Sequence, residues 1–221
     1  MAGAALVVTG CSASPVKMGA AATTTSQRIT IATLDTQVTN LSQAVKRYPG
    51  VISMSATQQT QQALTWLVRF QINDELARQA GITVTTAQSE AALVATLAAA
   101  KSQAAAAGVT NASNDLILAA NGIPPDLATE LGTFQAVNAQ YVKNANGGTL
   151  PTSSAAQART TAQLQHATCL AAKSLQIQVN PQFGQMDYSQ YPYQVVSAPS
   201  PVSRTPGPAP TASPSGQTPA C

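Results

Sequence analysis

The sequence around Cys11 predicts a covalent modification of its side chain. It follows Val8, Thr9 and Gly10 at the end of the apolar run 2–8. A small residue before such a Cys is typical of the bacterial lipobox, in which the sulfur takes a diacylglyceryl group and the Cys becomes the mature N-terminus. Because no Lys or Arg precedes Cys11, we expect the basic start of the signal to lie upstream.

The same motif predicts where the protein resides. We interpret residues 1–11 as a lipoprotein signal and residues 12–27, which are mostly small and polar, as a flexible tether. Lipid on Cys11 would then attach the protein to the cell membrane on its extracytoplasmic face. The alternative is a cytoplasmic protein in which the pattern occurs by chance. No stretch has the roughly 18 apolar residues of a spanning helix, so the lipid would be the anchor.

The other two cysteines leave two alternatives open. Cys169 lies in a helical pattern, and Cys221 is the last residue of the sequence. We favour a buried thiol at Cys169 and a free thiol at Cys221. The alternative is a disulfide between them, formed in an oxidising compartment. Their spacing matches no zinc motif.

The residues that most often perform acid–base or metal chemistry are scattered. His166 is the single histidine, which excludes a His-Glu-x-x-His zinc site and argues against a catalytic triad. Asp126 and Glu130 share a helical face, where compensation of the helix dipole explains them better than cation binding. The sequence contains neither G-x-S-x-G nor a P-loop. We therefore predict no catalytic residue, no metal and no cofactor, and a protein that is not an enzyme.

Composition narrows the range of partners. Charged residues make up 9% of the 221 residues, aromatic residues make up 4%, and the net charge is +3. The basic residues form no cluster of the size that phosphate binding requires, so a nucleic-acid partner is not expected.

Hydrophobic spacing predicts a mostly helical domain over residues 28–197. A β-like segment at 28–31 precedes the first helix, and alternation at 175–179 predicts a strand after the last, with a weaker strand at 193–196. Because β segments lie at both ends of the domain, we expect them to pair and close it. Residues 198–221 contain seven of the fourteen prolines and are predicted to be a disordered tail. The first helix is expected from about residue 34 to the stop at Tyr48-Pro49-Gly50. Five further helices are expected at about 57–80, 86–107, 113–121, 125–145 and 154–174.

The helix predicted at 57–80 carries the candidate ligand contacts. Its apolar arc is wide enough to imply neighbours on more than one side. Trp66 and Phe70 on this arc are either core residues or part of an apolar surface that binds peptide, and we keep them as peptide-binding candidates. The residues expected in the core are Leu67, Ile72 and Leu76.

Three segments carry a resemblance to a known family. They are Gln27-Arg-Ile-Thr30, the stretch LVRFQINDELAR at 67–78 followed by GITVT at 81–85, and VNPQFGQMD at 179–187. Their order and spacing over about residues 28–187 resemble the N-terminal domain of the periplasmic chaperone SurA, as found in stand-alone bacterial lipoproteins. The resemblance implies a mainly α fold of the SurA N-terminal or trigger-factor C-terminal type, closed by short β-strands at its two ends.

The resemblance also implies a function. It predicts a chaperone-like protein that binds unfolded or extended polypeptides without ATP. SurA carries parvulin-type prolyl isomerase domains as well, but no segment here could be one, so isomerase activity is not expected. The alternative, from a different class, is a structural or assembly lipoprotein that binds a single envelope partner through a fixed interface.

Overall fold

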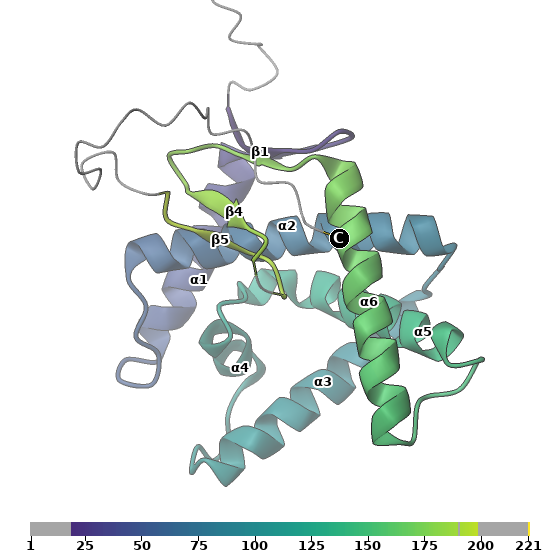
Figure 1. Cartoon of the computed structure of the whole chain (residues 1–221). Coiled ribbons are helices and arrows are strands. Elements are labelled where there is room, and N and C mark those ends of the chain that lie inside the picture. The colour runs from purple at the N-terminus through teal and green to yellow at the C-terminus, as the bar shows by residue number, and fades with distance from the viewer. Residues whose placement is uncertain (1–18, 190, 199–220) are drawn as a thin grey trace, which may run out of the picture.

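The computed structural model of the protein describes residues 19–189, 191–198 and Cys221. Within this part of the chain, six α-helices and a few short antiparallel strands make up the fold, which confirms the mainly helical class (Figure 1). The predicted signal with Cys11, the first part of the predicted tether and residues 199–220 of the predicted tail lie outside the described residues.

Local signals place the helix boundaries close to where the sequence predicts them. Helix α2 (Ala56–Ala80) ends at Gly81, whose φ of 63° is the left-handed conformation that glycine adopts at little cost. Helix α3 (Thr86–Ala106) begins after a capping box, in which Thr85 and Gln88 form both reciprocal bonds. The remaining helices are α1 (Ile31–Arg47), α4 (Asn114–Ala120), α5 (Ala128–Ala145) and α6 (Ser154–Leu175), with the 3-10 turn Pro125–Leu127 before α5.

Five short strands form two small antiparallel sheets in the described residues. In the first sheet, β1 (Ala20–Thr23) lies between β2 (Arg28–Thr30) and β3 (Gln178–Val179). In the second, β4 (Gln185–Asp187) pairs with β5 (Gln194–Val196). The predicted β segments therefore exist, but the segments at the two ends of the domain do not pair directly with each other.

Strand β1 corrects two of the predictions. Ala20, Ala21 and Ala22 are buried, so residues 20–23 belong to the folded domain and not to a flexible tether. The strand also separates the two segments that were expected to pair, and it hydrogen-bonds to each of them. A run of alanines and threonines has no hydrophobic alternation, so the pattern that reveals a strand is missing from this part of the sequence.

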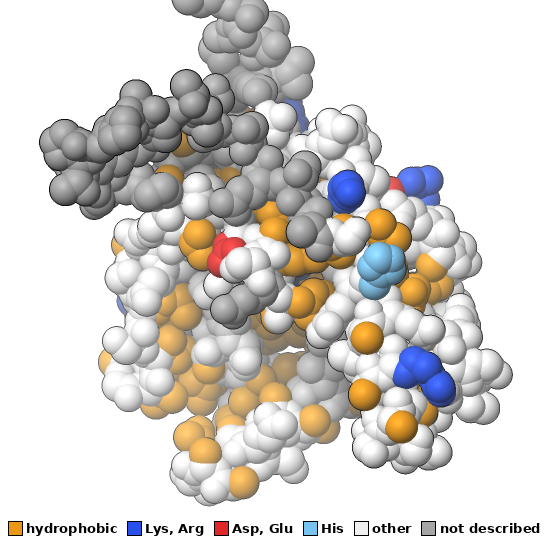
Figure 2. All heavy atoms as spheres, viewed as in Figure 1, with side chains coloured by type: hydrophobic (Ala, Val, Ile, Leu, Met, Phe, Trp, Pro, Cys, Tyr) orange, Lys and Arg blue, Asp and Glu red, His pale blue; other side chains and the backbone are white. Residues whose placement is uncertain are grey.

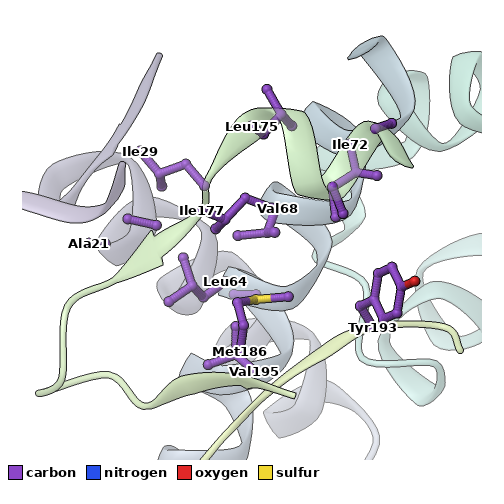
Figure 3. Packing of buried hydrophobic residues seen from close by; sticks show 14 of the residues in the cluster. Ala21, Ile29, Leu64, Val68, Ile72, Leu175, Ile177, Met186, Tyr193 and Val195 are labelled. Atoms are coloured by element: carbon purple, nitrogen blue, oxygen red, sulfur yellow. The ribbon is translucent and has the colours of Figure 1, made fainter. Parts of the chain in front are cut away.

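The core consists of two clusters that meet along α2. One lies among α1, α2, α6 and the two sheets (Figure 3), and the other lies among α1, α2, α4 and the start of α5. The predicted core residues Ile72 and Leu76 are each 2% exposed. Leu67 is only half-buried, and it packs against both clusters from the boundary between them.

Helix α3 approaches α5 very closely at Gly132. A Cβ atom at this position would lie 2.6 Å from the backbone carbonyl oxygen of Ser89. Beside this contact, the hydroxyl oxygens of Ser89 and Thr133 are 3.2 Å apart. The only buried residues of α3 are Ser89 and Leu97. In its alanine-rich second half, Ala100 and Ala104 are half-buried and pack against the core cluster that contains Leu97, and helix propensity adds to this packing.

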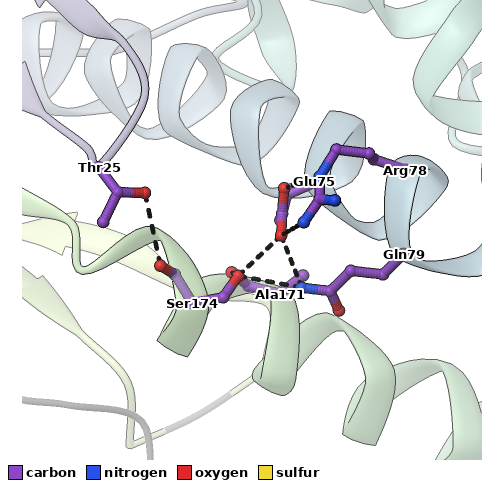
Figure 4. A network of polar contacts seen from close by, with 6 residues as sticks. All are labelled: Thr25, Glu75, Arg78, Gln79, Ala171 and Ser174. Atoms are coloured by element: carbon purple, nitrogen blue, oxygen red, sulfur yellow. Dashed lines mark hydrogen bonds and ion pairs between the residues drawn. The ribbon is translucent and has the colours of Figure 1, made fainter.

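A polar network joins α2 to α6 (Figure 4). The carboxylate of Glu75 accepts hydrogen bonds from Arg78, at 2.6 and 2.8 Å, from Gln79 and from the Ser174 hydroxyl at 2.9 Å. The hydrogen bond from Arg78 is the main reason that the pKa of Glu75 falls to about 2, although partial burial acts in the opposite direction. Ser174 lies in α6, so this carboxylate connects two helices.

A disulfide joins Cys169 in α6 to Cys221, with the two Cα atoms 5.9 Å apart. The favoured expectation of two separate thiols is therefore wrong. The two cysteines are 52 residues apart in the sequence, and no local pattern indicates that the chain returns to α6. The last residue of the predicted disordered tail is thus fixed to the helical domain.

Candidate functional site

A pocket lies between α2, α5, α6 and the turn that joins β4 to β5. This turn reaches towards α5 (Figure 1), and hydrophobic side chains gather in the hollow between α6 and α3 on the face in Figure 2. The pocket has aromatic and aliphatic walls with a small number of polar groups. Helix α2 contributes Arg69, Ile72 and Asn73, α5 contributes Phe134 and Asn138, α6 contributes Thr168, and the turn contributes residues 191–193.

Arg69 holds the β4–β5 turn against α2. Its Nε donates a hydrogen bond to the carbonyl oxygen of Tyr193 at 2.8 Å, and its Nη2 donates to that of Pro192 at 3.3 Å. Nearby, the backbone N–H of Val195 donates to the Thr65 hydroxyl at 2.8 Å in a buried position. The turn is therefore positioned by polar side chains of α2, and with it the aromatic wall of the pocket.

Tyr191 and Tyr193 form the wall on the side of the turn, and Tyr188 packs against Tyr193. The ring of Tyr193 contacts those of Tyr188 and Tyr191, with centroids 5.2 and 5.9 Å apart. Tyr193 is 7% exposed, and Figure 3 shows it at one end of the core cluster, whereas Tyr191 is 38% exposed. Burial raises the pKa of Tyr188 to about 12 and also raises that of Tyr193. Both hydroxyls therefore stay protonated at neutral pH.

Asn73 is the buried polar residue of the pocket. It is 3% exposed, and its Oδ1 has no hydrogen-bond partner within the described part of the chain. An unpaired buried acceptor costs about 1–3 kcal/mol relative to one that is hydrogen-bonded. Asn138 and Thr168 are half-buried on the opposite walls, and the Thr168 hydroxyl donates to the carbonyl oxygen of Leu164 at 2.8 Å. The Oδ1 atom is enclosed by its surroundings, so a ligand in the pocket would not reach it without a movement of the side chain.

Arg69 is also the cation of the pocket. Burial lowers its pKa below the usual value, while the coulombic interaction with Tyr191 acts in the opposite direction. The two ion pairs that the described residues form, Arg47 with Asp115 and Arg78 with Glu75, do not include it. Its guanidinium instead lies over the Trp66 ring, 4.9 Å from the centroid, which provides partial compensation through a cation–π contact.

The predicted ligand residues Trp66 and Phe70 lie next to the pocket rather than in its lining. They form a triangle with Phe134, in which the ring centroids are 5.7–6.0 Å apart. Phe70 is 9% exposed and belongs to the core cluster between α1, α2, α4 and α5. Trp66 is half-buried and reaches the pocket through two of its lining residues, Phe134 and Arg69.

The polar residues of the pocket were not predicted from the sequence. Arg69 and Asn73 lie on either side of Ile72, on the face of α2 that packs against other elements. Polar residues on an otherwise apolar face of a helix can indicate a binding site, and this was the pattern that could have revealed them.

His166 lies exposed on α6. No group of three or more potential metal ligands occurs among residues 19–189, 191–198 and 221. None of the helices described here combines the length and hydropathy that a membrane crossing requires.

Comparison with known proteins gives no match. Neither a protein-family model, nor a curated protein, nor a solved structure is significantly similar to the chain. The resemblance to SurA N-terminal domains therefore remains a prediction from the three sequence segments.

Proposed function

We propose that the protein is a lipid-anchored, extracytoplasmic binding protein for unfolded or extended polypeptides. It would act in a chaperone-like manner, without ATP and without prolyl isomerase activity. The observation that carries the proposal is the pocket between α2, α5 and α6, which combines an aromatic wall with the guanidinium of Arg69. An extended polypeptide offers both apolar side chains and backbone carbonyl groups, so its chemistry complements that of the pocket.

The disulfide supports the proposed location. Bonds such as Cys169–Cys221 persist in secreted and cell-envelope proteins and are rare in the reducing cytosol. The lipobox-like sequence ending at Cys11 independently predicts the same side of the membrane. Both features agree with a protein that meets its clients outside the cytoplasm.

The aromatic wall supports the proposed ligand class. Tyr191 is the exposed member of the tyrosine group, and Tyr193 and Phe134 extend the same surface inwards. Tyrosine combines a large apolar ring with a hydroxyl and is enriched at binding surfaces for this reason. Such a surface accepts many side chains through non-directional contacts, which suits a protein that binds varied clients.

The experiment is an aggregation assay with the purified, disulfide-bonded chain and a chemically unfolded client protein. We expect light scattering to rise more slowly in its presence, without ATP. Tyr191→Ser should reduce the protection, and its loss of affinity for the client should be about fivefold, the equivalent of about 1 kcal/mol. Val94→Ser is the matched control, because Val94 is 67% exposed on α3 and is not part of the pocket.

Two results would count against the proposal. One is a client that aggregates at the same rate with and without the protein. The other is an equal loss of protection in the Tyr191→Ser and Val94→Ser variants, which would remove the assignment to the pocket. In either case, the structural or assembly lipoprotein with one fixed envelope partner becomes the better description.

A further inference from the structure

Strand β5 lies along helix α2, and polar side chains of α2 hold it there. The Thr65 hydroxyl accepts a hydrogen bond from the backbone N–H of Val195 at 2.8 Å, and the side-chain amide of Gln61 donates to the Ser197 hydroxyl at 2.9 Å. Gln61 and Thr65 are four residues apart and therefore share one face of the helix. Because Thr65 binds a main-chain group, this contact is available to any extended segment with a free N–H at the same position.

The side chains of β5 alternate between the core and the solvent. Val195 is 4% exposed and packs in the core cluster with Leu64 and Met186, which Figure 3 shows beside it, whereas Gln194 is exposed. Such alternation is the pattern of a half-buried strand. The position of β5 therefore requires one apolar side chain and does not dictate the rest of the sequence.

Few interactions hold β5 in place. It pairs with β4 over three residue pairs, in a sheet of two strands, and a two-stranded sheet is marginally stable by itself. Val195 is the one buried residue of the strand. The turn before β5 is anchored separately, because Arg69 donates to the carbonyl oxygens of Tyr193 and Pro192. Release of β5 therefore breaks far fewer interactions than unfolding of the domain.

Release of β5 also leaves groups without partners. Thr65 is 2% exposed and would lose the N–H that its hydroxyl binds, and an unpaired buried polar group is unfavourable. Strand β4 would lose its backbone partners, and the open edge of a strand readily accepts another strand. The vacated position thus matches an extended polypeptide segment with an apolar residue.

We propose that β5 occupies the site at which the protein binds an extended segment of a client polypeptide, and that the client takes the place of β5. The client's backbone N–H donates to Thr65, its apolar side chain fills the position of Val195, and its main chain pairs with β4. The turn at 191–193 stays on Arg69. This inference rests on the proposed peptide-binding function and specifies where the polypeptide binds. The pocket beside Arg69 has room for about one water molecule while β5 is docked, so the strand has to move for a client to bind here.

The first test uses a peptide with the sequence of residues 193–198, YQVVSA. It carries a fluorescent label at its N-terminus, and its binding to the disulfide-bonded native chain is followed by anisotropy. The comparison peptide has an ester oxygen in place of the amide N–H that corresponds to that of Val195. This change removes the hydrogen bond to Thr65 and keeps every side chain. We expect the ester peptide to bind about tenfold more weakly.

Variants of the chain test whether β5 blocks the site. Val195→Ala weakens the docking of β5 and leaves Thr65 in place, so the site is open in a larger fraction of the molecules. The YQVVSA peptide should then bind about tenfold more tightly than to the native chain. Leu41→Ala is the matched control, since Leu41 is 0% exposed and lies in the core cluster to which β5 does not belong. It should leave the affinity for the peptide unchanged.

The outcomes separate this inference from the proposed function. If an unfolded client binds the native chain, but YQVVSA does not compete with it and Val195→Ala does not tighten its binding, the client binds elsewhere and the inference is wrong. If the ester peptide binds as tightly as the amide peptide, the contact with Thr65 is overturned.

Two further results are decisive. If Val195→Ala and Leu41→Ala tighten peptide binding equally, the gain comes from a general loosening of the fold, and the blocking role of β5 is overturned. If neither the peptide nor the unfolded client binds, the proposed function fails and this inference fails with it.

Discussion

Cys169 in the last helix and Cys221 at the end of the sequence are linked by a disulfide, with their Cα atoms 5.9 Å apart. The bond closes a loop whose ends are 52 residues apart and which contains strands β3, β4 and β5. The β4–β5 turn of the pocket therefore lies within a covalently closed segment. Thr168, the pocket residue on α6, is the immediate neighbour of Cys169.

We predict that Cys221→Ser destabilises the protein. A disulfide closing a loop of this length contributes roughly 2–4 kcal/mol, mainly by restricting the unfolded chain. Denaturant unfolding of the native chain and the variant measures the difference. Reductant should destabilise the native chain by a similar amount and leave Cys221→Ser unchanged. Equal unfolding midpoints for the two proteins under oxidising conditions would contradict the stabilising role of the bond.

The same bond changes what is expected from removal of residues 198–221. Removal of a disordered tail would have almost no effect on the melting temperature. Because the deletion also removes Cys221, we expect a loss similar to that of Cys221→Ser. In a Cys169→Ser background, the same deletion should change the melting temperature little. A large further loss in that background would mean that the deleted segment packs on the domain.

A second prediction concerns the contact between α3 and α5. Gly132→Ala places a Cβ atom 2.6 Å from the backbone oxygen of Ser89, so the two helices must move apart. Overpacking of this kind costs about 1–3 kcal/mol of unfolding free energy, although alanine has the better helix propensity. Glu130→Ala, an exposed change on the same helix, is the control. A Gly132→Ala protein as stable as the native chain would refute the close packing.

A third prediction follows from Glu75. Its pKa in the folded protein is about 2, well below its ordinary value of 4.5, chiefly because Arg78 donates hydrogen bonds to it. The stabilisation is therefore present in full above about pH 4.5 and is lost as the pH falls towards 2. Glu75→Gln should cost roughly 1–3 kcal/mol at pH 7 and should flatten the pH dependence of unfolding in this acid range. An unchanged pH profile in the variant would assign acid sensitivity to other groups.

A fourth prediction tests the anchor. With an intact upstream signal, the native protein should fractionate with membranes, whereas Cys11→Ser should be released or remain unprocessed. Stable attachment normally requires two hydrophobic anchors, and lipoprotein maturation can supply more than one acyl chain. Immunoblots of the membrane and soluble fractions measure this. If both proteins are recovered equally in membranes, Cys11 is not the lipidation site.

The sequence predicted the helices well because their signals are local. The capping box at Thr85 and the stop at Gly81 are each contained within a few residues. Strand β1 escaped prediction because its alanines show no alternation, and they become buried only in the folded protein, where β1 pairs with β2 and β3 and packs in the core cluster with α2 and α6. Composition alone assigned that segment to a tether.

The pocket could not be predicted for the same reason. Arg69 and Tyr193 are 124 residues apart in the sequence, yet the hydrogen bond between them positions the aromatic wall. Trp66 and Phe70 were recognised from their spacing on α2. This spacing places them on the buried arc, but it does not distinguish a core residue from a residue that binds a ligand. The structure assigns Phe70 to the core and places Trp66 beside two lining residues of the pocket.

The most direct test of the peptide-binding proposal uses Trp66, the only tryptophan of the chain. Its ring contacts Phe134 and Arg69, both of which line the pocket, so an occupied pocket should change its surroundings. We predict a saturable shift of its fluorescence when an unfolded polypeptide without tryptophan is added to the disulfide-bonded chain, and no shift when the same polypeptide is added in its folded form. Fluorescence that stays unchanged up to the solubility limit of the unfolded polypeptide would contradict the proposal.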